Sequence, residues 1–169
     1  EDYDARREQK GWNQIGFDDS HWRPVVIQEA PKGILRPQMA APVKIMERYD
    51  IQKVTKLNAD QVASASVSTK RTVDLSAFVL DMGQNLAGFP EITVRGKRGQ
   101  KVTLIVAEAL TDEGACNQRQ TGRQHYYEYT LKGEGDETWH PRFSYYGFRY
   151  IQVEGAVLKG QKNPQKLPV

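Results

Sequence analysis

Cysteine is almost absent from this 169-residue sequence, because Cys116 is the only one. No disulfide can form within the chain, and the redox compartment stays open. The three histidines, His21, His125 and His140, are far apart, and no Cys or His pair has the spacing of zinc ligands. This spacing of Cys and His argues against a structural zinc site.

The sequence also lacks long apolar runs and an excess of charge of one sign. No run approaches the roughly 18 residues of a membrane span, and 24 Lys and Arg are interspersed with 21 Asp and Glu. We therefore expect neither a membrane nor a nucleic acid as partner. The first residue is Glu1 rather than methionine, so we interpret the chain as a piece of a longer protein.

Motifs for catalysis are missing as well. No GxSxG nucleophile elbow occurs, and GKRGQK lacks the spacing of a phosphate-binding loop. No spacing singles out two of the 21 acids as a glycosidase pair. Calcium could be sought at Asp18 with Asp19, or at Asp81 with Asn85, but short polar residues of this kind are more typical of turns.

What the sequence has is alternation of apolar and polar residues, which predicts strands with one buried face. The segments concerned are residues 25–28, 43–57, 61–75 and 77–82. Helical periodicity is weak throughout. We therefore expect an all-β fold, a two-sheet antiparallel β-sandwich of the jelly-roll kind.

Two longer segments predict β-hairpins. In residues 90–110, the glycine-rich turn RGKRGQ separates two alternating runs, and in residues 125–143 the turn GEGDE does the same. The residues expected to face the core are Ile92, Val94, Val102, Leu104, Val106, Tyr127, Tyr129, Leu131, Trp139, Pro141 and Phe143.

Aromatic residues crowd into the stretch WHPRFSYYGFRY, residues 139–150. Trp139 and Phe143 share one parity and are expected in the core, as are Ile151 and Val153 beyond Gly147, where a bulge or a bend can change which side of the strand faces inward. The opposite parity holds Tyr146, Phe148 and Tyr150. A strand that is apolar on both faces must be covered on both, so the second face is predicted to dock a neighbouring domain.

A sugar-binding site is the alternative use of these rings. Rings that stack on pyranoses need polar neighbours to bond hydroxyl groups, and NQRQTGRQHYY at residues 117–127 offers that combination. Many surface loops have the same composition. The candidate substrate-binding residues are Asn117, Gln118, Arg119, Gln120, His125 and Tyr126.

Several long strings resemble one family, the bacterial α-L-rhamnosidases of glycoside hydrolase family 78. They are YDARREQKGWNQIGFDDSHWRPV, LDMGQNLAGFPEITVRGKRGQKVTLIVAEALTDEG and NQRQTGRQHYYEYTLKGEGDETWHPRFSYYGFRYIQVEG. The resemblance implies a multidomain enzyme with N-terminal β-sandwiches before a catalytic barrel of α-helices. Residues 1–35 would end a preceding galactose-binding-like sandwich, 36–157 would form a concanavalin-like sandwich, and 158–169 would be a linker.

The resemblance also bears on activity. Nothing in the chain matches the family's DCPxRxER-type catalytic stretch, so neither Asp81 nor Glu108 inherits a catalytic role. The expected function is a non-catalytic fragment that supports the barrel of the parent chain and shapes its substrate entrance. The alternative is an autonomous carbohydrate-binding module for rhamnose-containing glycans. A third reading is a sandwich that joins subunits. No cofactor is expected in the fragment, although some relatives bind calcium in the N-terminal sandwich.

Overall fold

The computed structural model describes residues 1–64, 76–119, 121 and 124–169. By their contacts these fall into two compact units. One unit joins Glu1–Arg7 to Arg48–Val169, and the other is Glu8–Glu47. No helix in the described part of the chain is long and apolar enough to cross a membrane.

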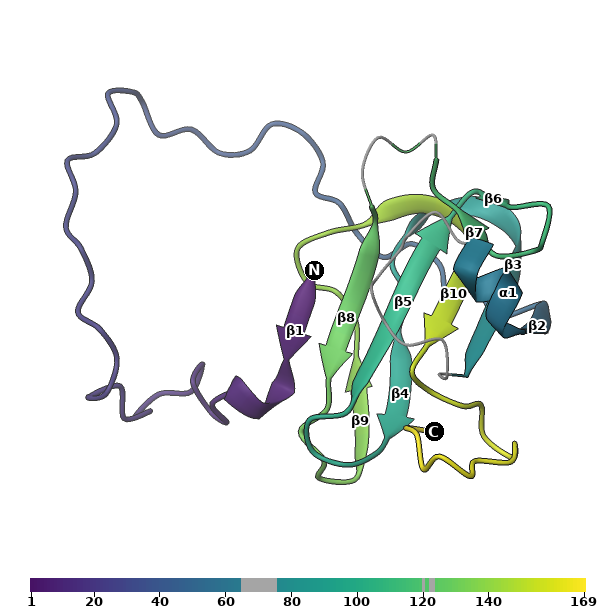
Figure 1. Cartoon of the computed structure of the whole chain (residues 1–169). Coiled ribbons are helices and arrows are strands. Elements are labelled where there is room, and N and C mark those ends of the chain that lie inside the picture. The colour runs from purple at the N-terminus through teal and green to yellow at the C-terminus, as the bar shows by residue number, and fades with distance from the viewer. Residues whose placement is uncertain (65–75, 120, 122–123) are drawn as a thin grey trace. The chain divides into compact units, whose positions relative to one another are not determined.

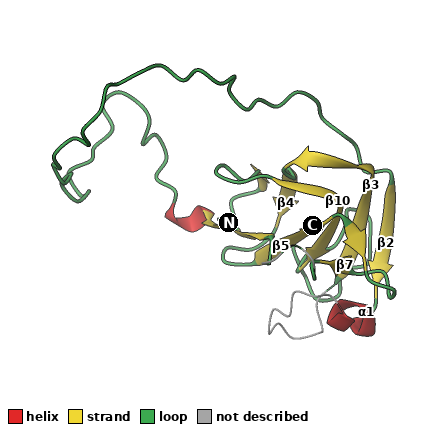
Figure 2. Ribbon diagram, turned by 90° about the horizontal axis from the view of Figure 1, so that it is seen from above, coloured by secondary structure: helices red, strands yellow, loops and turns green. Residues whose placement is uncertain are grey.

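Strands dominate the first unit (Figures 1 and 2). A six-stranded sheet has the order β1-β8-β5-β10-β3-β2, and β4 with β9 and β6 with β7 form two-stranded sheets. All pairs are antiparallel except β1 with β8. The elements are β1 (Asp2–Asp4), η1 (Ala5–Arg7), β2 (Lys53–Leu57), α1 (Ala59–Ser64), β3 (Ala77–Gly88), β4 (Ile92–Arg95), β5 (Lys101–Ala107), β6 (Ala109–Leu110), β7 (Cys116–Asn117), β8 (Tyr126–Thr130), β9 (Asp136–Trp139) and β10 (Tyr146–Glu154).

The main core lies between the six-stranded sheet and the β4–β9 pair, which confirms the β-sandwich prediction. Side chains alternate across a strand, so every second residue of β5, of β8 and of the first half of β3 points into this core. The buried members are Ala5, Phe78, Leu80, Met82, Val94, Val102, Leu104, Val106, Tyr127, Tyr129, Leu131, Trp139, Phe148, Ile151, Val153 and Ala156.

Both predicted hairpins are wrong, because neither glycine-rich turn joins neighbouring strands. β4 pairs with β9, whereas β5 pairs with β8 and β10. The connections 96–100 and 131–135 therefore each cross from one sheet to the other. They lie against one another, since the N–H of Gly99 donates to the carbonyl of Leu131 and the N–H of Leu131 donates to that of Gln100. Alternation of apolar and polar residues indicates which face of a strand points inward, but it does not identify the strand with which it pairs.

The second face of the six-stranded sheet is covered by the chain itself in the part that the structure describes. Val79 and Ala115 share a cluster with the half-buried Val62 of α1, and Ile105 and Cys116 share another. Half-buried Tyr150 packs against both clusters. The second face is therefore not open for docking a neighbouring domain, contrary to the prediction.

Two residues depart from the expected parities, and a bulge in β10 explains the first of them. The register with β3 shifts between Phe148 and Tyr150, so Phe148 joins the main core together with Ile151. Phe143 was expected in the core, but it lies between β9 and β10 and its side chain is 92% exposed. β9 ends at Trp139; the predicted alternation still holds for Pro141, which is buried, and fails at Phe143.

The first residues belong to the sandwich. β1 adds a parallel strand to the outer edge of β8, and Tyr3 stacks on Tyr129 with ring centroids 5.9 Å apart and lies 5.8 Å from the ring of Trp139. Ala5 is buried in the main core. Such a long-range pairing leaves no local trace in the sequence.

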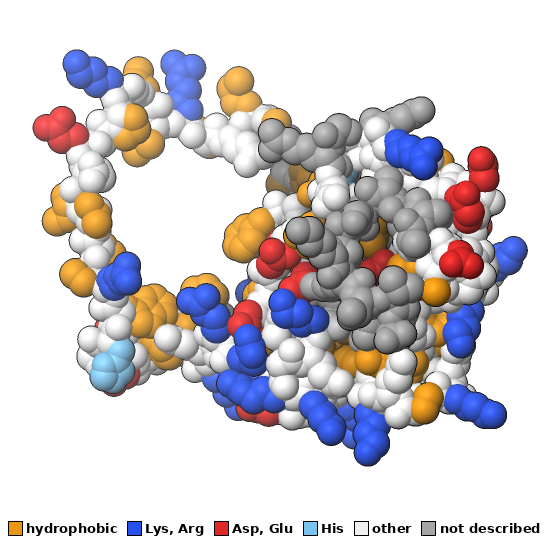
Figure 3. Space-filling view, viewed as in Figure 1, with side chains coloured by type: hydrophobic (Ala, Val, Ile, Leu, Met, Phe, Trp, Pro, Cys, Tyr) orange, Lys and Arg blue, Asp and Glu red, His pale blue; other side chains and the backbone are white. Residues whose placement is uncertain are grey.

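The other unit, Glu8–Glu47, contains turns but no strand or helix. Asp18 accepts the N–H of Ser20 at 3.0 Å, and Phe17 and Trp22 have ring centroids 5.5 Å apart, which confirms the predicted turn. The predicted strand 25–28 is wrong. With no partner strand among the described residues, its backbone has no ladder to join, and apolar side chains of this unit lie exposed along it (Figure 3).

The predicted strands between residues 43 and 82 have mixed outcomes. Residues 43–57 supply only β2, and 77–82 form the start of β3 as expected. Residues 61–64 lie in α1 rather than in a strand. The remainder of that segment, 65–75, lies outside the described residues.

Candidate functional site

Gln118, in the connection between β7 and β8, is buried and fully engaged with backbone. Its Nε2 donates to the carbonyl oxygens of Val106 and His125, both at 2.6 Å, and its Oε1 accepts the N–H of His125 at 3.1 Å. A buried amide with all these bonds holds the connection to β5. It does not present its polar atoms to a sugar.

The neighbouring candidates are engaged locally. Asn117 Oδ1 accepts the N–H of Arg119 at 3.0 Å, which is the bond of a tight turn. The Arg119 side chain is exposed. Gln120 lies outside the described residues.

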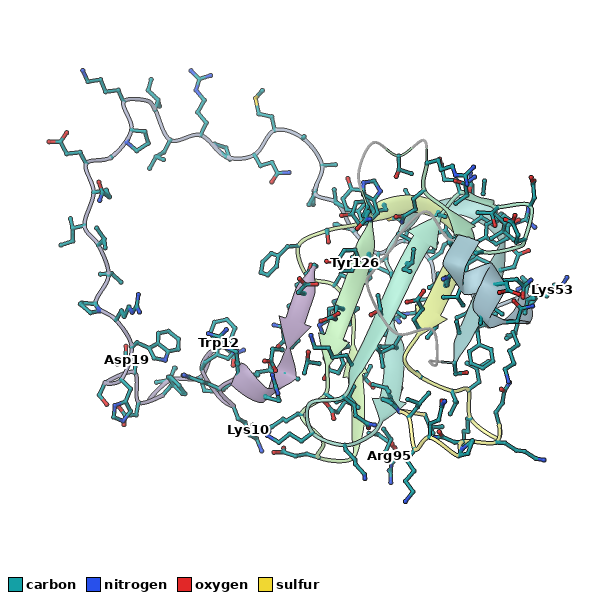
Figure 4. All side chains as sticks on the ribbon, in the orientation of Figure 1. Lys10, Trp12, Asp19, Lys53, Arg95 and Tyr126 are labelled. Carbon is teal, nitrogen blue, oxygen red and sulfur yellow. The ribbon has the colours of Figure 1, made fainter. Side chains whose placement is uncertain are left out.

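His125 and Tyr126 contact opposite faces of the six-stranded sheet. The His125 ring stacks on Tyr146, with centroids 4.2 Å apart and planes 8° from parallel, and Tyr146 packs against the main core. Tyr126, at one end of β8 (Figure 4), packs against the cluster of Ile105 and Cys116 instead. The structure therefore joins Gln118 to His125 and Asn117 to Arg119, but it does not gather the candidates into one site.

Two exposed rings lie elsewhere, in the loop between β9 and β10. Phe143 is 92% and Tyr145 54% exposed. The Glu1 carboxylate holds this loop in place, because it accepts the N–H groups of Arg142 and Phe143, both at 3.1 Å, and the hydroxyl of Ser144 at 3.3 Å. In the sequence, Pro141 indicates that strand pairing stops here. No feature of the sequence indicates that Glu1, at the other end of the chain, contacts this loop.

The carboxylate of Asp81 forms a two-pronged ion pair with Arg149. Arg149 Nε lies 2.8 Å from Oδ1 and Nη2 lies 3.0 Å from Oδ2. These hydrogen bonds lower the pKa of Asp81, so the carboxylate is a stable structural anion rather than a proton donor. Asn85, its proposed calcium partner, donates instead to Glu108 at 3.5 Å.

Metal and thiol chemistry have little support in the described residues. Among them, no three His, Cys, Asp or Glu side chains are grouped so that they could hold a metal ion. Cys116 is buried, and burial raises the pKa of its thiol to about 12. A thiol that stays protonated at neutral pH is a poor nucleophile.

Comparison with known sequences identifies the family in which this fold occurs. The family described as the bacterial α-L-rhamnosidase concanavalin-like domain matches residues 71–168, and the α-L-rhamnosidase N-terminal domain matches residues 1–47. The chain belongs to the bacterial α-L-rhamnosidase family. The expected resemblance is thereby confirmed, and the sandwich is the concanavalin-like domain of that family.

Two curated α-L-rhamnosidases illustrate the relationship. The protein from Streptomyces avermitilis is 37% identical over 160 residues, which is 92% of this chain and 14% of that relative. One from Formosa agariphila is 33% identical over 165 residues, 93% of this chain and 15% of that relative. This chain therefore spans about one seventh of the length of the curated relatives it matches.

Solved structures agree. An α-L-rhamnosidase from Dictyoglumus thermophilum superposes with a TM-score of 0.74 at 30% identity, over 99% of this chain and 17% of that one. The Streptomyces avermitilis α-L-rhamnosidase, solved with L-rhamnose, gives a TM-score of 0.72 at 33% identity, over 99% of this chain and 15% of that one. The chain thus corresponds to the non-catalytic N-terminal region of these enzymes.

Proposed function

We propose that this chain is an accessory part of an α-L-rhamnosidase which supports the catalytic barrel of the parent protein and shapes its substrate entrance. The observation that carries the proposal is the coverage: more than nine tenths of the chain matches, but only 14% to 16% of each curated relative. The rest of the parent protein carries the hydrolysis of terminal α-L-rhamnosides.

The chemistry of the described side chains supports a structural role. Asp81 is held by Arg149, and Glu137 accepts the hydroxyl of Tyr129 and the N–H groups of Lys132 and Gly133, each at 2.8 Å. Both carboxylates are therefore occupied by hydrogen bonds to their own chain, as structural groups are. The Phe143 and Tyr145 rings offer a ready contact for a neighbouring domain.

The test compares this chain with the full parent protein on an aryl α-L-rhamnoside. We expect turnover by the parent and none by the 169-residue chain at equal molar concentration. Turnover by the purified chain would contradict the proposal, as would an inactive parent protein.

The second candidate is a carbohydrate-binding module. This function is favoured by the exposed side chains of Arg119, Phe143 and Tyr145. It predicts saturable binding of L-rhamnose, with calcium present, in isothermal titration calorimetry. The matched pair Tyr145→Ala and Tyr146→Ala separates a ring open to a ligand from a ring packed on the core. A flat titration of the unmodified chain argues against this function.

A further inference from the structure

The outer edge of β4 carries backbone groups that β9 does not use. Arg95 exchanges two hydrogen bonds with Val169: its N–H donates to the Val169 carbonyl at 2.8 Å and its carbonyl accepts the Val169 N–H at 2.9 Å. Such a reciprocal pair is the unit of an antiparallel ladder. Val169, at the end of the tail that Figure 1 shows beside β4, therefore begins a third strand next to β4.

Thr93 faces the same edge. Opposed residues in an antiparallel pair alternate between hydrogen-bonded and non-hydrogen-bonded positions. The backbone N–H and carbonyl of Arg95 bond Val169, so Arg95 and Asp136 form a non-hydrogen-bonded pair toward β9. Two residues along, Thr93 and Thr138 form another. Side chains approach closely at such positions, and here Thr93 Oγ1 lies 2.9 Å from Thr138 Oγ1. The N–H and carbonyl of Thr93 thus point outward, and no described residue bonds either of them.

The tail that leads to Val169 is firmly held. Asn163 bonds both backbone groups of Leu167, at 2.8 and 2.9 Å, and Pro168 is buried, with its carbonyl accepting the N–H of Val157 at 2.8 Å. Gln100 Nε2 donates to the carbonyl of Lys166 at 2.9 Å. These bonds fix the direction in which the backbone arrives at β4, whose Arg95 end is marked in Figure 4.

We propose that the outer edge of β4, from Glu91 to Arg95, is the docking site for the polypeptide that continues from Val169 in the parent protein, laid antiparallel to β4. The proposal rests on the proposed function. It also rests on continuity, because the Val169 bridge already occupies the first position, and a strand advancing about 3.3 Å per residue places its second further residue opposite Thr93. An exposed edge is otherwise an aggregation risk that proteins cover.

Hydrogen exchange of single amides tests the proposal, in this chain and in the full parent protein. We expect the Thr93 amide to exchange at least about a hundredfold more slowly in the parent than in the 169-residue chain. The Val94 and Arg95 amides serve as controls, since β9 and Val169 bond them in both proteins.

Two outcomes would overturn the docking assignment. One is equal exchange of Thr93 in both proteins. The other is protection of Thr93 in the 169-residue chain that grows with its concentration, which would assign the edge to a second copy. Rhamnosidase activity of the same parent sample is measured separately, so that an inactive parent refutes the proposed function whether or not Thr93 is protected.

Discussion

Replacing Gly133 by alanine should disrupt the contact between the two sheet-to-sheet connections. A Cβ atom at Gly133 would lie 2.3 Å from the backbone nitrogen of Arg98 and 2.7 Å from its Cα. Those are backbone atoms, which cannot swing aside as a side chain can. Gly135 is the matched control, because its φ is also positive but its added Cβ meets no atom within 4 Å.

The magnitudes follow from these two geometries. Each substitution forces an L-residue into a left-handed backbone, at about 1 to 2 kcal/mol. Gly133→Ala adds the cost of displacing a packed backbone, about 2 kcal/mol. We therefore expect Gly133→Ala to lower the free energy of unfolding by about 2 kcal/mol more than Gly135→Ala.

Equilibrium unfolding in urea, followed by tryptophan fluorescence, measures the difference. With a slope of about 2 kcal/mol per molar urea, the midpoint of Gly133→Ala should fall about 1 M below that of Gly135→Ala. Midpoints that agree within about 0.2 M would refute the close packing of the two connections.

Three further changes probe the sandwich. Tyr3→Ala should cost about 2 kcal/mol in urea unfolding through lost ring packing, against less than about 0.5 kcal/mol for the exposed Tyr145→Ala; equal losses would show that β1 adds nothing to the core. The Asp81 pKa is lowered in the folded state, so its stabilisation is present above the unfolded value of about 3.9 and is lost as pH falls through the folded value. Asp81→Asn should therefore destabilise the chain at pH 7 and progressively less below pH 4, whereas a constant difference across this range would contradict the ion pair. Cys116 should resist iodoacetamide at pH 8 until the chain is unfolded in urea, and rapid labelling of the folded chain would show that the thiol is accessible.

Inward faces were predictable from the sequence, but strand partners were not. Val102, Leu104 and Val106 enter the main core as their spacing indicates, because alternation reports burial directly. The partner of β5 depends on contacts between distant segments, and a glycine-rich turn can join strands of one sheet or cross between two. Both predicted hairpins failed at that step.

The candidate ligand site shows a second limit. Gln118 and Arg119 look equally suited to bind a sugar in the sequence, but one side chain is buried among backbone carbonyls and the other is exposed. Residue type gives the hydrogen bonds a side chain can make, and only the fold decides whether they are already made. The loop at Phe143 was missed for the same reason, since its anchor Glu1 is remote in sequence.

The strand β1 places a constraint on how this family can exchange modules during evolution. Residues 1–47 match the N-terminal domain of the family, but residues 1–7 complete the sheet of the sandwich that follows. A gene fusion joined after residue 47 would give the sandwich a new upstream neighbour and strip it of its outer strand. Only a donor domain that supplies a strand fitting beside β8, with a ring at the position of Tyr3, could replace it, so the two modules are expected to be inherited together.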